Sequence, residues 1–593
     1  MKNIHVIILR LLILFCVTSY VNAKEVKALE NSSCGKPDIY IEGISNLDVA
    51  AYNDISVNES YNNTKDYVSF LSDSVPAPLY YDNPIMRGYH PDPSICRVGD
   101  DYYMVNSSFE WFPCIPIYKS KDLVNWKLIG YGITRAGQLT FGKGLKDSNG
   151  IFAVTIRHHN GLFYLITTSV QGKGNFYITA SDPAGEWSDP VYLHSPGIDP
   201  SLFWDTDGKC YYIGHGFIEK ERQWPNEQGV WMQQLDLERK ELIGPRRQLT
   251  HGHASNAQWA EGPHLYKVGN KYMLLVAEGG TEFYHAVTQF YSDSIWGPYV
   301  PAQINPILTH RNLGKSYPIY AVGHADFVKT QNDEYWMVAL GKRNFDGYCY
   351  LSRETFLTPM KFETLNGSLS AIVNDGEGRL MPRQVRPDLP WTPVESSTVR
   401  DNFSGDKLAL EWNFLRTPLT QWYNVKNGAL TMNLRPEVAD SLENPSLIAK
   451  RMEDRKYSIS TRMKFRSRKL NEQAGLIIYR ASVSNIKFLR RGDNVVIMTT
   501  RKGVSSEMES MPCEKGEKLI LKAYSDGTKV FFSYGTNENN MKRMSVAVPL
   551  SIISDQEYER YNGPYIGMYA TSNREKSDAK ASFDWFDYEE LSK

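Results

Sequence analysis

Three acidic residues stand in similar short motifs that are far apart in the chain. Asp92 lies in HPDPS, Asp199 in IDPS and Glu261 in WAEGP. Asp-Pro is a common turn dipeptide, so a single motif of this kind indicates only a turn. Three acids in related contexts also suit general acid–base chemistry, in which a carboxylate takes a proton and a carboxylic acid gives one. That chemistry requires a fold that brings the three motifs together.

A hairpin signature recurs five times and supplies such a fold. Aligned on their aromatic residues, successive copies are 61, 48, 61 and 63 residues apart. Repeats of about 50 residues built from short strands are typical of a β-propeller. We therefore predict an all-β fold with a five-bladed β-propeller over residues 83–385. The five copies are GDDYYMV (99–105), NGLFYLI (160–166), DGKCYYI (207–213), GNKYMLL (269–275) and NDEYWMV (332–338).

The acids occupy equivalent places in these repeats. The innermost strand of a propeller blade starts near the central channel. About ten residues before the five aligned aromatic residues stand Asp92, Phe152–Ala153, Asp199, Glu261 and His324. We expect three acids and a histidine, from four blades, to face one funnel.

The sequence pattern changes after the predicted propeller. The Pro-rich segment RPDLPWTP (386–393) is typical of a domain boundary. Between 395 and 593, short alternating strand patterns follow one another without helices, which indicates a β-sandwich. No catalytic constellation is evident in this part, so we expect it to support the propeller.

The beginning of the chain resembles a secretory signal. Residues 1–23 combine basic residues, an apolar run that is too short to span a membrane, and small residues before a cleavage point. We expect a secreted or periplasmic protein without a membrane span. Residues 24–82 form a polar extension.

Composition narrows the expected partners. The formal net charge is −1 and Lys and Arg are scattered, so nucleic acid is not expected as a partner. The seven cysteines form no zinc-binding spacing. Aromatic residues make up 12% of the chain, which fits strand cores and also the platforms that bind sugar rings.

Several longer motifs resemble the family 43 glycoside hydrolases, in particular the β-xylosidase and α-L-arabinofuranosidase branch. The resemblance covers about 83–385 and includes the order of the motifs, and the sandwich that follows also fits that branch. The motifs are NPIMRGYHPDPSICRVGDDYYMVNSSFEWFP, DPS at 199–201, WAEGPHLYK (259–267), AEGGTEFYHAVT (277–288), GHADFV (323–328) and SRETF (352–356).

This resemblance implies an inverting glycosidase with an oligosaccharide substrate. Asp92 matches the general base, Glu261 the general acid, and Asp199 the residue that orients this acid and tunes its pKa. An inverting pair leaves roughly 6.5–9.5 Å for a water molecule, which acids on different blades can do. A negative charge near Glu261 would raise its pKa and keep it protonated. Substrate contacts are implied for Phe109, His324 and Arg353.

The chain departs from the family pattern at the second blade. Phe152 stands where a tryptophan is usual, which alters the shape of the sugar subsite. Tyr565 in NGPYIG resembles an aromatic residue that the sandwich lends to the active site. No cofactor is expected to be required. A structural Ca²⁺ near His324 is possible by resemblance, although such a hard cation would need several oxygen ligands.

Three hypotheses about function follow. The first is an exo-glycosidase that releases terminal xylose from β-1,4-xylo-oligosaccharides of plant hemicellulose, or arabinofuranose as the close alternative. The second is a retaining enzyme of the fructofuranosidase type, whose carboxyl groups would be only ~5–5.5 Å apart. The third is a sugar-binding propeller without catalysis, which would have no use for an acid with a raised pKa.

Overall fold

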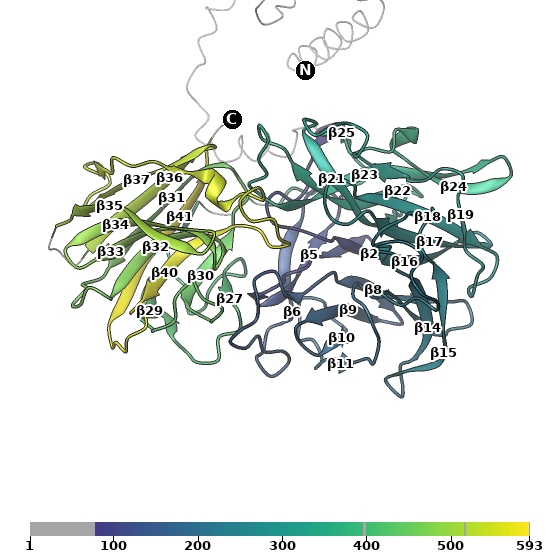
Figure 1. Ribbon diagram of the computed structural model, residues 1–593, viewed down its shortest axis with the longest axis horizontal. Helices are drawn as coiled ribbons and strands as arrows, with labels where there is room; N and C mark the ends of the chain where they lie inside the picture. Colours follow the sequence, from purple (N-terminus) through teal and green to yellow (C-terminus); the bar gives the residue numbers. More distant parts are fainter. Residues whose placement is uncertain (1–76, 395–398, 515–517, 592–593) are drawn as a thin grey trace, which may run out of the picture. The chain divides into compact units, whose positions relative to one another are not determined.

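The computed structural model describes residues 77–593 except 395–398, 515–517 and 592–593. The predicted signal peptide and most of the polar extension lie outside the described residues. The regular secondary structure of the described chain is almost entirely β-strand, and its helical content is two short 3₁₀ turns, η2 (Asn374–Gly376) and η3 (Leu550–Ile553). Five antiparallel sheets follow one another along the chain and are the five predicted blades (Figure 1). The predicted all-β fold class, a five-bladed propeller followed by a sandwich, is confirmed.

Each blade is formed by one continuous stretch of chain. Blade 1 contains β2 (Ser94–Val98), β3 (Asp101–Val105), β5 (Cys114–Ser120) and β6 (Lys127–Ile133). Blade 2 contains β7 (Gly150–Ile151), β8 (Thr155–His159), β9 (Leu162–Val170), β10 (Gly174–Ala180) and β11 (Val191–Tyr192). Blade 3 contains β12 (Ser201–Trp204), β13 (Cys210–His215), β14 (Val230–Asp236) and β15 (Glu241–Thr250).

The last two blades have the same plan. Blade 4 contains β16 (Glu261–Val268), β17 (Lys271–Glu278), β18 (Ala286–Ser292), β19 (Val300–Pro301) and β20 (Leu308–Thr309). Blade 5 contains β21 (Ile319–Lys329), β22 (Tyr335–Arg343), β23 (Arg353–Leu365) and β24 (Ser368–Val373). Two strands outside the blades, β1 (Tyr80–Asp82) and β25 (Arg383–Val385), pair with each other and so join the two ends of the propeller.

The recurring hairpin signature has a simple conformational cause. In each copy, the turn of the hairpin contains a residue in the left-handed region of φ. That residue is Gly99, Gly161, Gly208 or Gly269 in the first four blades, with φ between 60° and 79°, and Asp333 in the fifth, with φ 63°. Glycine adopts this conformation without strain and Asp tolerates it, which explains why these residue types recur before the aromatic position.

A buried ionic cluster joins the inner strands at the centre of the propeller. The Asp326 carboxylate on β21 accepts hydrogen bonds from Ser94 on β2 (2.6 Å), from Tyr266 on β16 and from Arg157 on β8 (2.8 Å). Asp326 is fully buried, and the charge of Arg157 holds the pKa of its carboxyl well below the ordinary value despite the opposing effect of burial. Four blades therefore share one carboxylate below the funnel.

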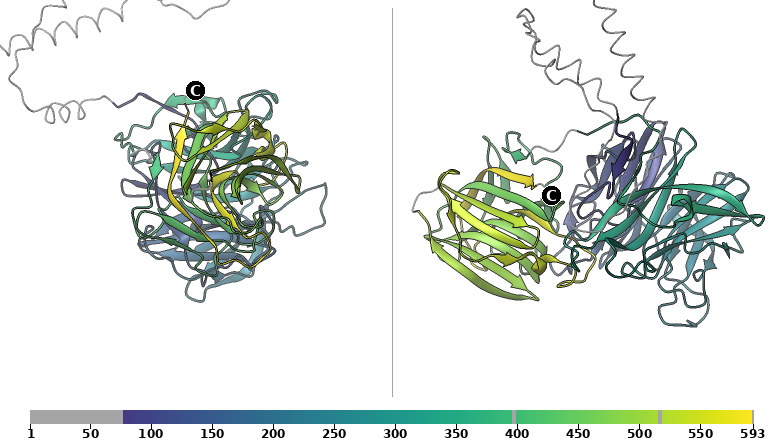
Figure 2. Two further views of the ribbon diagram at one scale, coloured as in Figure 1. Left: turned by 90° about the vertical axis from the view of Figure 1, so that its left-hand side faces the viewer. Right: turned by 90° about the horizontal axis from the view of Figure 1, so that it is seen from above.

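The C-terminal part is a sandwich of two antiparallel sheets (Figure 2). One sheet contains β26 (Arg400–Asp401), β28 (Tyr423–Val425), β29 (Leu430–Asn433), β31 (Lys456–Lys464), β36 (Lys518–Asp526), β37 (Lys529–Gly535), β38 (Lys542–Arg543), β39 (Val548–Pro549) and β41 (Lys580–Glu590). The other contains β27 (Asn413–Leu415), β30 (Ser446–Arg451), β32 (Gln473–Ala481), β33 (Ser484–Arg491), β34 (Asn494–Arg501), β35 (Val504–Pro512) and β40 (Tyr565–Thr571).

One strand of the second sheet comes from the propeller sequence. β4 (Trp111–Phe112), between the second and third strands of blade 1, pairs with β27 through Phe112 and Phe414. Trp111 is fully buried and stacks on Tyr565 of β40, with ring centroids 3.6 Å apart. The two parts of the chain therefore share a sheet and a core, an arrangement that a two-residue strand does not reveal in the sequence.

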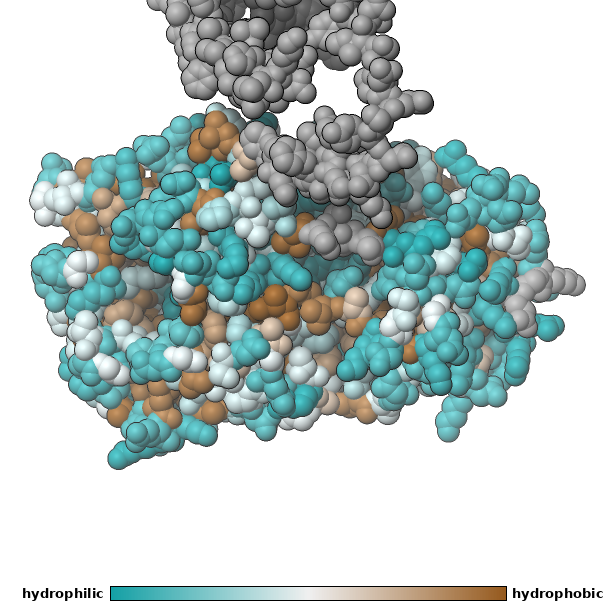
Figure 3. All heavy atoms as spheres, turned by 180° about the vertical axis from the view of Figure 1, so that it is seen from behind, coloured by the Kyte–Doolittle hydropathy of each residue, from teal (hydrophilic) through white to brown (hydrophobic). Residues whose placement is uncertain are grey.

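No described helix is long and apolar enough to cross a membrane. The face shown in Figure 3 is mostly hydrophilic, with hydrophobic residues in scattered small groups.

The shared core predicts that Trp111→Ala destabilises both parts of the chain. Replacing a fully buried tryptophan by alanine costs about 3–5 kcal/mol, because the cavity left behind lacks contacts. Calorimetry should show a lower melting temperature with propeller and sandwich still unfolding together. Tyr524→Ala, which removes a 37% exposed tyrosine from the sandwich surface, should leave the melting temperature almost unchanged. An unchanged transition for Trp111→Ala would contradict the shared core.

Candidate active site

A cavity of about 410 Å³ opens where the inner strands of the propeller begin. The structure brings most of the predicted site residues together there, from all five blades and one sandwich loop. The predicted residues that line it are Asp92, Phe109, Phe152, Asp199, Glu261, His324 and Arg353. The further lining residues are Ala153, Ile198, Trp259, Gly279, Gly280, Thr281, Glu282, Tyr284 and Tyr561.

Asp92 is held as a charged carboxylate. Its side chain is buried and forms an ion pair with the Arg353 guanidinium, with Nη1 and Oδ1 2.6 Å apart. The Ser107 hydroxyl donates a second hydrogen bond to its other oxygen, at 2.5 Å. A carboxylate with a cation and a hydroxyl donor is stabilised in its ionised form. Asp92 therefore has the state that a general base requires.

Glu261, in contrast, favours its protonated form. Burial and then the charge of Asp92 raise the pKa of its carboxyl to about 8, against a smaller lowering effect of Arg353. Burial and the charges of Glu261 and Asp92 likewise raise the pKa of Asp199 well above its ordinary value. The cause for Glu261 thus differs from the sequence-based expectation, because burial and the charge of Asp92, and not that of Asp199, raise this pKa. Glu261 therefore favours its protonated form at neutral pH.

Several of these side chains depend on an unusual backbone conformation. Asp92, Phe109, Asp199, Trp259 and His324 all have φ between 45° and 53°. This left-handed region is costly for residues other than glycine and persists where the surrounding structure enforces it. Asp92, Asp199 and Trp259 stand two residues before the inner strands β2, β12 and β16, whereas Phe109 follows β3 and His324 lies inside β21. All five line the cavity, and such a cluster of unusual conformations is typical of a functional site.

Aromatic rings form one wall of the cavity. The rings of Phe109 and Phe152 lie 5.0 Å apart, and Tyr561 from the sandwich lies 6.2 Å from Phe109 and nearly parallel to it. The Arg353 guanidinium lies over the rings of Phe109 and Tyr561, at 5.3 and 5.8 Å. Arg353 also donates to the backbone carbonyl of Tyr561 at 2.8 Å.

The prediction for Tyr565 needs a correction. Its side chain is completely buried in the core that Trp111 shares with the sandwich, and it does not line the cavity. Tyr561, four residues earlier, is the aromatic residue that the sandwich contributes. The first residue of β40 must face the sheet core, whereas the loop before it reaches the propeller.

The loop that carries Tyr561 is anchored to the propeller. The next residue, Asn562, donates its side-chain amide to Glu110 at 2.8 Å and its backbone N–H to Ser148 at 3.2 Å. The Ser352 hydroxyl donates to the Asn562 carbonyl at 3.1 Å. These bonds fix the position of Tyr561 at the cavity.

Histidines near the cavity are held neutral by burial. His324 lies against Gly262, where a Cβ atom would stand 2.9 Å from the imidazole ring, so this approach requires glycine. Burial lowers the pKa of His324, and it lowers that of His215 to about 4. His215 Nδ1 donates to the Ile198 carbonyl at 2.8 Å, which leaves Nε2 as an acceptor 4.0 Å from the Glu261 carboxyl.

The surroundings of His324 do not fit the Ca²⁺ considered from the sequence. Among the described residues, no group of three or more His, Cys, Asp or Glu side chains could hold a metal ion. The carboxylate below the funnel, Asp326, is already in an ion pair with Arg157. Ca²⁺ requires several hard oxygen ligands, and the His324 side chain supplies none.

Sequence reasoning missed Trp259, Glu282, Tyr284 and His215. Trp259 was visible two residues before Glu261 in WAEGP, and it is 38% exposed at the cavity. Glu282 and Tyr284 lie in the quoted segment AEGGTEFYHAVT, but no residue-type signal distinguishes them there. His215 ends the second strand of blade 3, so only the fold places it beside Glu261.

Comparisons with known proteins agree with this geometry. Residues 81–365 match the glycosyl hydrolases family 43, and residues 400–589 match the β-xylosidase C-terminal concanavalin A-like domain. A xylosidase/arabinosidase of Butyrivibrio fibrisolvens is 38% identical, over 86% of this chain and 99% of its own. A non-reducing-end α-L-arabinofuranosidase of Bacteroides ovatus is 34% identical, over 85% and 94%.

Solved structures show the same similarity over most of the chain. The xylan β-1,4-xylosidase of Bacillus halodurans superposes with a TM-score of 0.80 and 32% identity, over 86% of this chain and all of the other. The family 43 protein B of the Bacteroides ovatus xyloglucan locus also gives 0.80, with 33% identity and the same coverage.

The arrangement of charges predicts that Asp92→Asn lowers the pKa of Glu261 from about 8. The substitution removes a repelling charge and frees Arg353 to attract the carboxylate, and both effects favour ionisation. Carboxyl infrared or ¹³C NMR titration, with Glu261→Gln to assign the signal, measures this shift. An unchanged pKa would contradict the electrostatic link between the two acids.

Proposed function

Because this chain belongs to glycosyl hydrolases family 43, we propose that it is an exported inverting exo-glycosidase that releases terminal xylose from β-1,4-xylo-oligosaccharides of plant hemicellulose. The observation that carries this proposal is the contrast between Asp92 and Glu261, two acids in one cavity that favour opposite protonation states at neutral pH. Release of α-L-arabinofuranose is the alternative, since similar proteins carry both names.

The proposed reaction follows from this contrast. The ionised Asp92 takes a proton from a water molecule, and the oxygen of that water attacks the anomeric carbon. Glu261 gives its proton to the glycosidic oxygen, so that the leaving sugar departs with an intact hydroxyl group. Attack from the face opposite the leaving group inverts the anomeric configuration. The carboxylate of Glu261 must regain a proton before the next turnover, which its pKa of about 8 favours.

Other residues prepare the two acids for these steps. Arg353 and Ser107 hold the Asp92 carboxylate in one orientation. Asp199, with its own raised pKa, keeps the proton near Glu261. Phe109, Phe152 and Tyr561 provide rings against which the carbon-bound hydrogens of a pentose can pack. The limited cavity, about 410 Å³, supports the removal of one terminal sugar at a time.

A side-by-side assay tests the proposal. Purified protein is given an aryl β-D-xylopyranoside and an aryl α-L-arabinofuranoside, and ¹H NMR follows the anomer that forms first. We expect faster hydrolysis of the xyloside with inversion. Faster hydrolysis of the arabinofuranoside would select the alternative, and a first product of unchanged configuration would require a retaining mechanism. Binding without cleavage of either compound would overturn the catalytic function.

Asp92→Asn and Glu261→Gln should each lower kcat on xylobiose by about 10²–10⁴-fold, because each removes a proton-transfer step. Circular dichroism should show an unchanged fold, since each substitution keeps the side-chain shape. Near-normal turnover by either variant would remove that residue from the proposed mechanism.

The leaving group distinguishes the two roles. Glu261→Gln should be much less damaging on aryl xylosides with acidic phenols, which depart without protonation, whereas Asp92→Asn should be equally damaging on both kinds of substrate. An equal loss for Glu261→Gln on all substrates would contradict its role as the acid.

Trp259 is expected to bind the sugar on the leaving side of the scissile bond. Its ring lies against Gly280, where a Cβ atom would be only 3.0 Å away, and it lines the cavity two residues before Glu261. Trp259→Ala should lower kcat/KM on xylobiose about tenfold, the loss expected for one stacking contact of ~1.4 kcal/mol. Xylosyl fluoride has no leaving sugar and should be unaffected. Tyr348→Ala, another partly exposed aromatic residue, is the control.

A further inference from the structure

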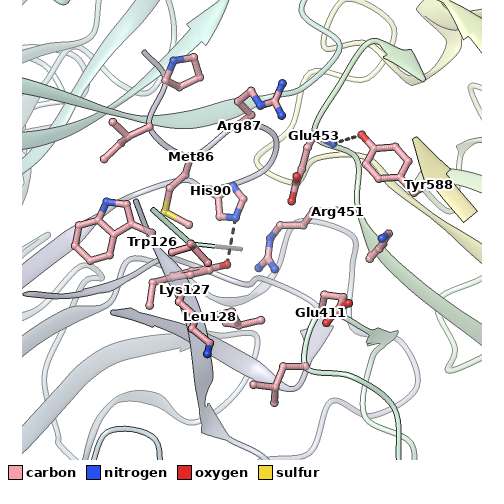
Figure 4. Close-up of a pocket in the computed structure, with 16 residues that line it drawn as sticks. Met86, Arg87, His90, Trp126, Lys127, Leu128, Glu411, Arg451, Glu453 and Tyr588 are labelled. Atoms are coloured by element: carbon pink, nitrogen blue, oxygen red, sulfur yellow. Dashed lines mark hydrogen bonds between the residues drawn. The ribbon is translucent and has the colours of Figure 1, made fainter. Parts of the chain in front are cut away.

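A second cavity, of about 600 Å³, lies between the propeller and the sandwich (Figure 4). We call it the seam cavity. It shares no lining residue with the candidate active site. Its propeller side comes from the segment before β2 and from blade 1, and its sandwich side from β30, β41 and the chain before β27. The residues used below are His90, Trp126, Glu411, Lys450, Arg451 and Glu453.

The seam cavity contains polar groups whose hydrogen-bonding capacity the described residues do not satisfy. His90 is 4% exposed, and its Nε2 bonds the Tyr118 hydroxyl at 3.1 Å. Its Nδ1 has no hydrogen bond of good geometry, although the nearby backbone of Arg87 and Gly88 acts to raise the pKa of the ring. Lys450 has no carboxylate within ion-pair distance in the described part of the chain, and its nearest aromatic ring is Tyr588 at 5.1 Å. A buried polar group without a hydrogen bond is costly, so such groups are normally met by water or a ligand.

Two carboxylates face the same space. No salt bridge of the described residues includes Glu411 or Glu453, although the charges of Lys450 and Arg87 act to lower the pKa of Glu453. Burial raises the pKa of Glu453, and it lowers the pKa of Lys450. Both shifts have the direction expected for charged groups that lie in one cavity without touching. Both line the seam cavity, whose volume of about 600 Å³ can hold a molecule that bonds to both.

The mixture of groups indicates the kind of ligand. Figure 4 shows Met86 and Trp126 on one side of the cavity and Arg451, Glu453 and Glu411 on the other. An anion would meet the two carboxylates, and a cation would meet Lys450 and Arg451. A sugar suits both, because its hydroxyl groups donate to carboxylates and accept from cations, while its carbon-bound hydrogens pack on an aromatic ring.

We propose that the seam cavity is a second carbohydrate-binding site, which takes a neutral pentose or a short pentose oligosaccharide. The pentose character of this ligand rests on the proposed function; the existence of the site rests on the unpaired groups around the cavity. The sugar could come from the product of the reaction or from its substrate, which offer the same hydroxyl chemistry.

The location of this site connects it to the candidate active site. Arg451 donates from Nε to the backbone carbonyl of Tyr89 at 2.8 Å. The backbone N–H of His90 donates to the Arg353 carbonyl at 3.0 Å, and Asp92 follows two residues later. A sugar bonded to His90 and Arg451 would therefore touch the segment that carries the proposed base, and would contact propeller and sandwich at once.

Equilibrium dialysis with radiolabelled xylobiose tests the site. The full chain carries Glu261→Gln so that the sugar is not cleaved. We expect two molecules of xylobiose per chain at saturation, and one after Lys450→Met or Glu453→Gln is added. Lys522→Met, at an exposed lysine of β36, is the matched control and should keep two. Both pocket variants should retain wild-type hydrolysis rates when Glu261 is restored, because neither touches the active-site cavity.

Three outcomes would overturn the proposal. One is a single bound molecule in the parent; another is two in both pocket variants. The third is displacement of the second molecule by citrate but not by xylose, which would assign the cavity to anions. Xylose and xylotriose are then compared as competitors of the bound xylobiose. Stronger competition by xylose indicates that the product is the natural occupant, and stronger competition by xylotriose indicates the substrate. If the wild type cleaves no pentoside, the proposed function fails. The loss of one bound xylobiose in the Lys450→Met and Glu453→Gln variants would still show that the seam cavity binds sugar.

Discussion

The buried ion pair between Arg353 and Asp92 holds the candidate site together. Taking two charges out of water is expensive, and their attraction offsets this cost only when the geometry is good and the other hydrogen bonds are met. Here the pair is 2.6 Å long, the second carboxylate oxygen accepts from Ser107, and the guanidinium donates to the carbonyl of Tyr561. The same guanidinium lies over two aromatic rings of the cavity wall.

This pair joins segments that are far apart in the chain. Asp92 and Arg353 are 261 positions apart, so the first and last blades must close on each other before the pair can form. Arg353 and Tyr561 are separated by another 208 positions and belong to different parts of the protein. The ion pair of Asp92 with Arg353 thus requires a closed propeller, and the position of Arg353 requires the sandwich.

A second series of ion pairs also links the active-site cavity of the propeller to the sandwich. Glu282 at the cavity pairs with Lys342 on β22, Lys342 with Asp555 of the sandwich, and Asp555 with Arg480 on β32, at 2.6–2.7 Å each. The buried members of this series would be costly without their partners across the seam. The sandwich therefore supports the propeller, as expected from the sequence, and it also supplies groups to the site.

The sequence revealed those features that repeat or that have strict backbone requirements. The five hairpins were recognisable because each needs a residue that tolerates positive φ next to an aromatic strand residue. Asp92, Asp199 and Glu261 were recognisable because they occupy the same place in their repeats. Contacts between distant segments leave no such periodic signal, which is why β4, Tyr561 and the central role of Asp326 appeared only in the structure.

The error at Tyr565 shows where reasoning from motifs stops. The motif placed an aromatic residue of the sandwich near the cavity, and the loop does deliver one, but the exact position depends on where β40 begins. A tyrosine inside the strand stacks on Trp111 in the core, whereas one four residues earlier reaches the substrate side. The boundary between strand and loop is set by the pairing of β40 with β30 and β32, which no local sequence pattern encodes.

The proton held between Glu261 and Asp199 has a cost for folding. Both acids have a raised pKa in the folded chain, so the folded state binds more protons than the unfolded state, for Glu261 between the ordinary pKa of 4.5 and about 8. Stability contributed by this pair therefore falls as the pH rises through that window. Asp326 has a lowered pKa, so its contribution is complete at neutral pH and is lost only in acid. The ion pair of Asp326 with Arg157 thus still stabilises the propeller in the pH range where the raised pKa of Glu261 reduces stability.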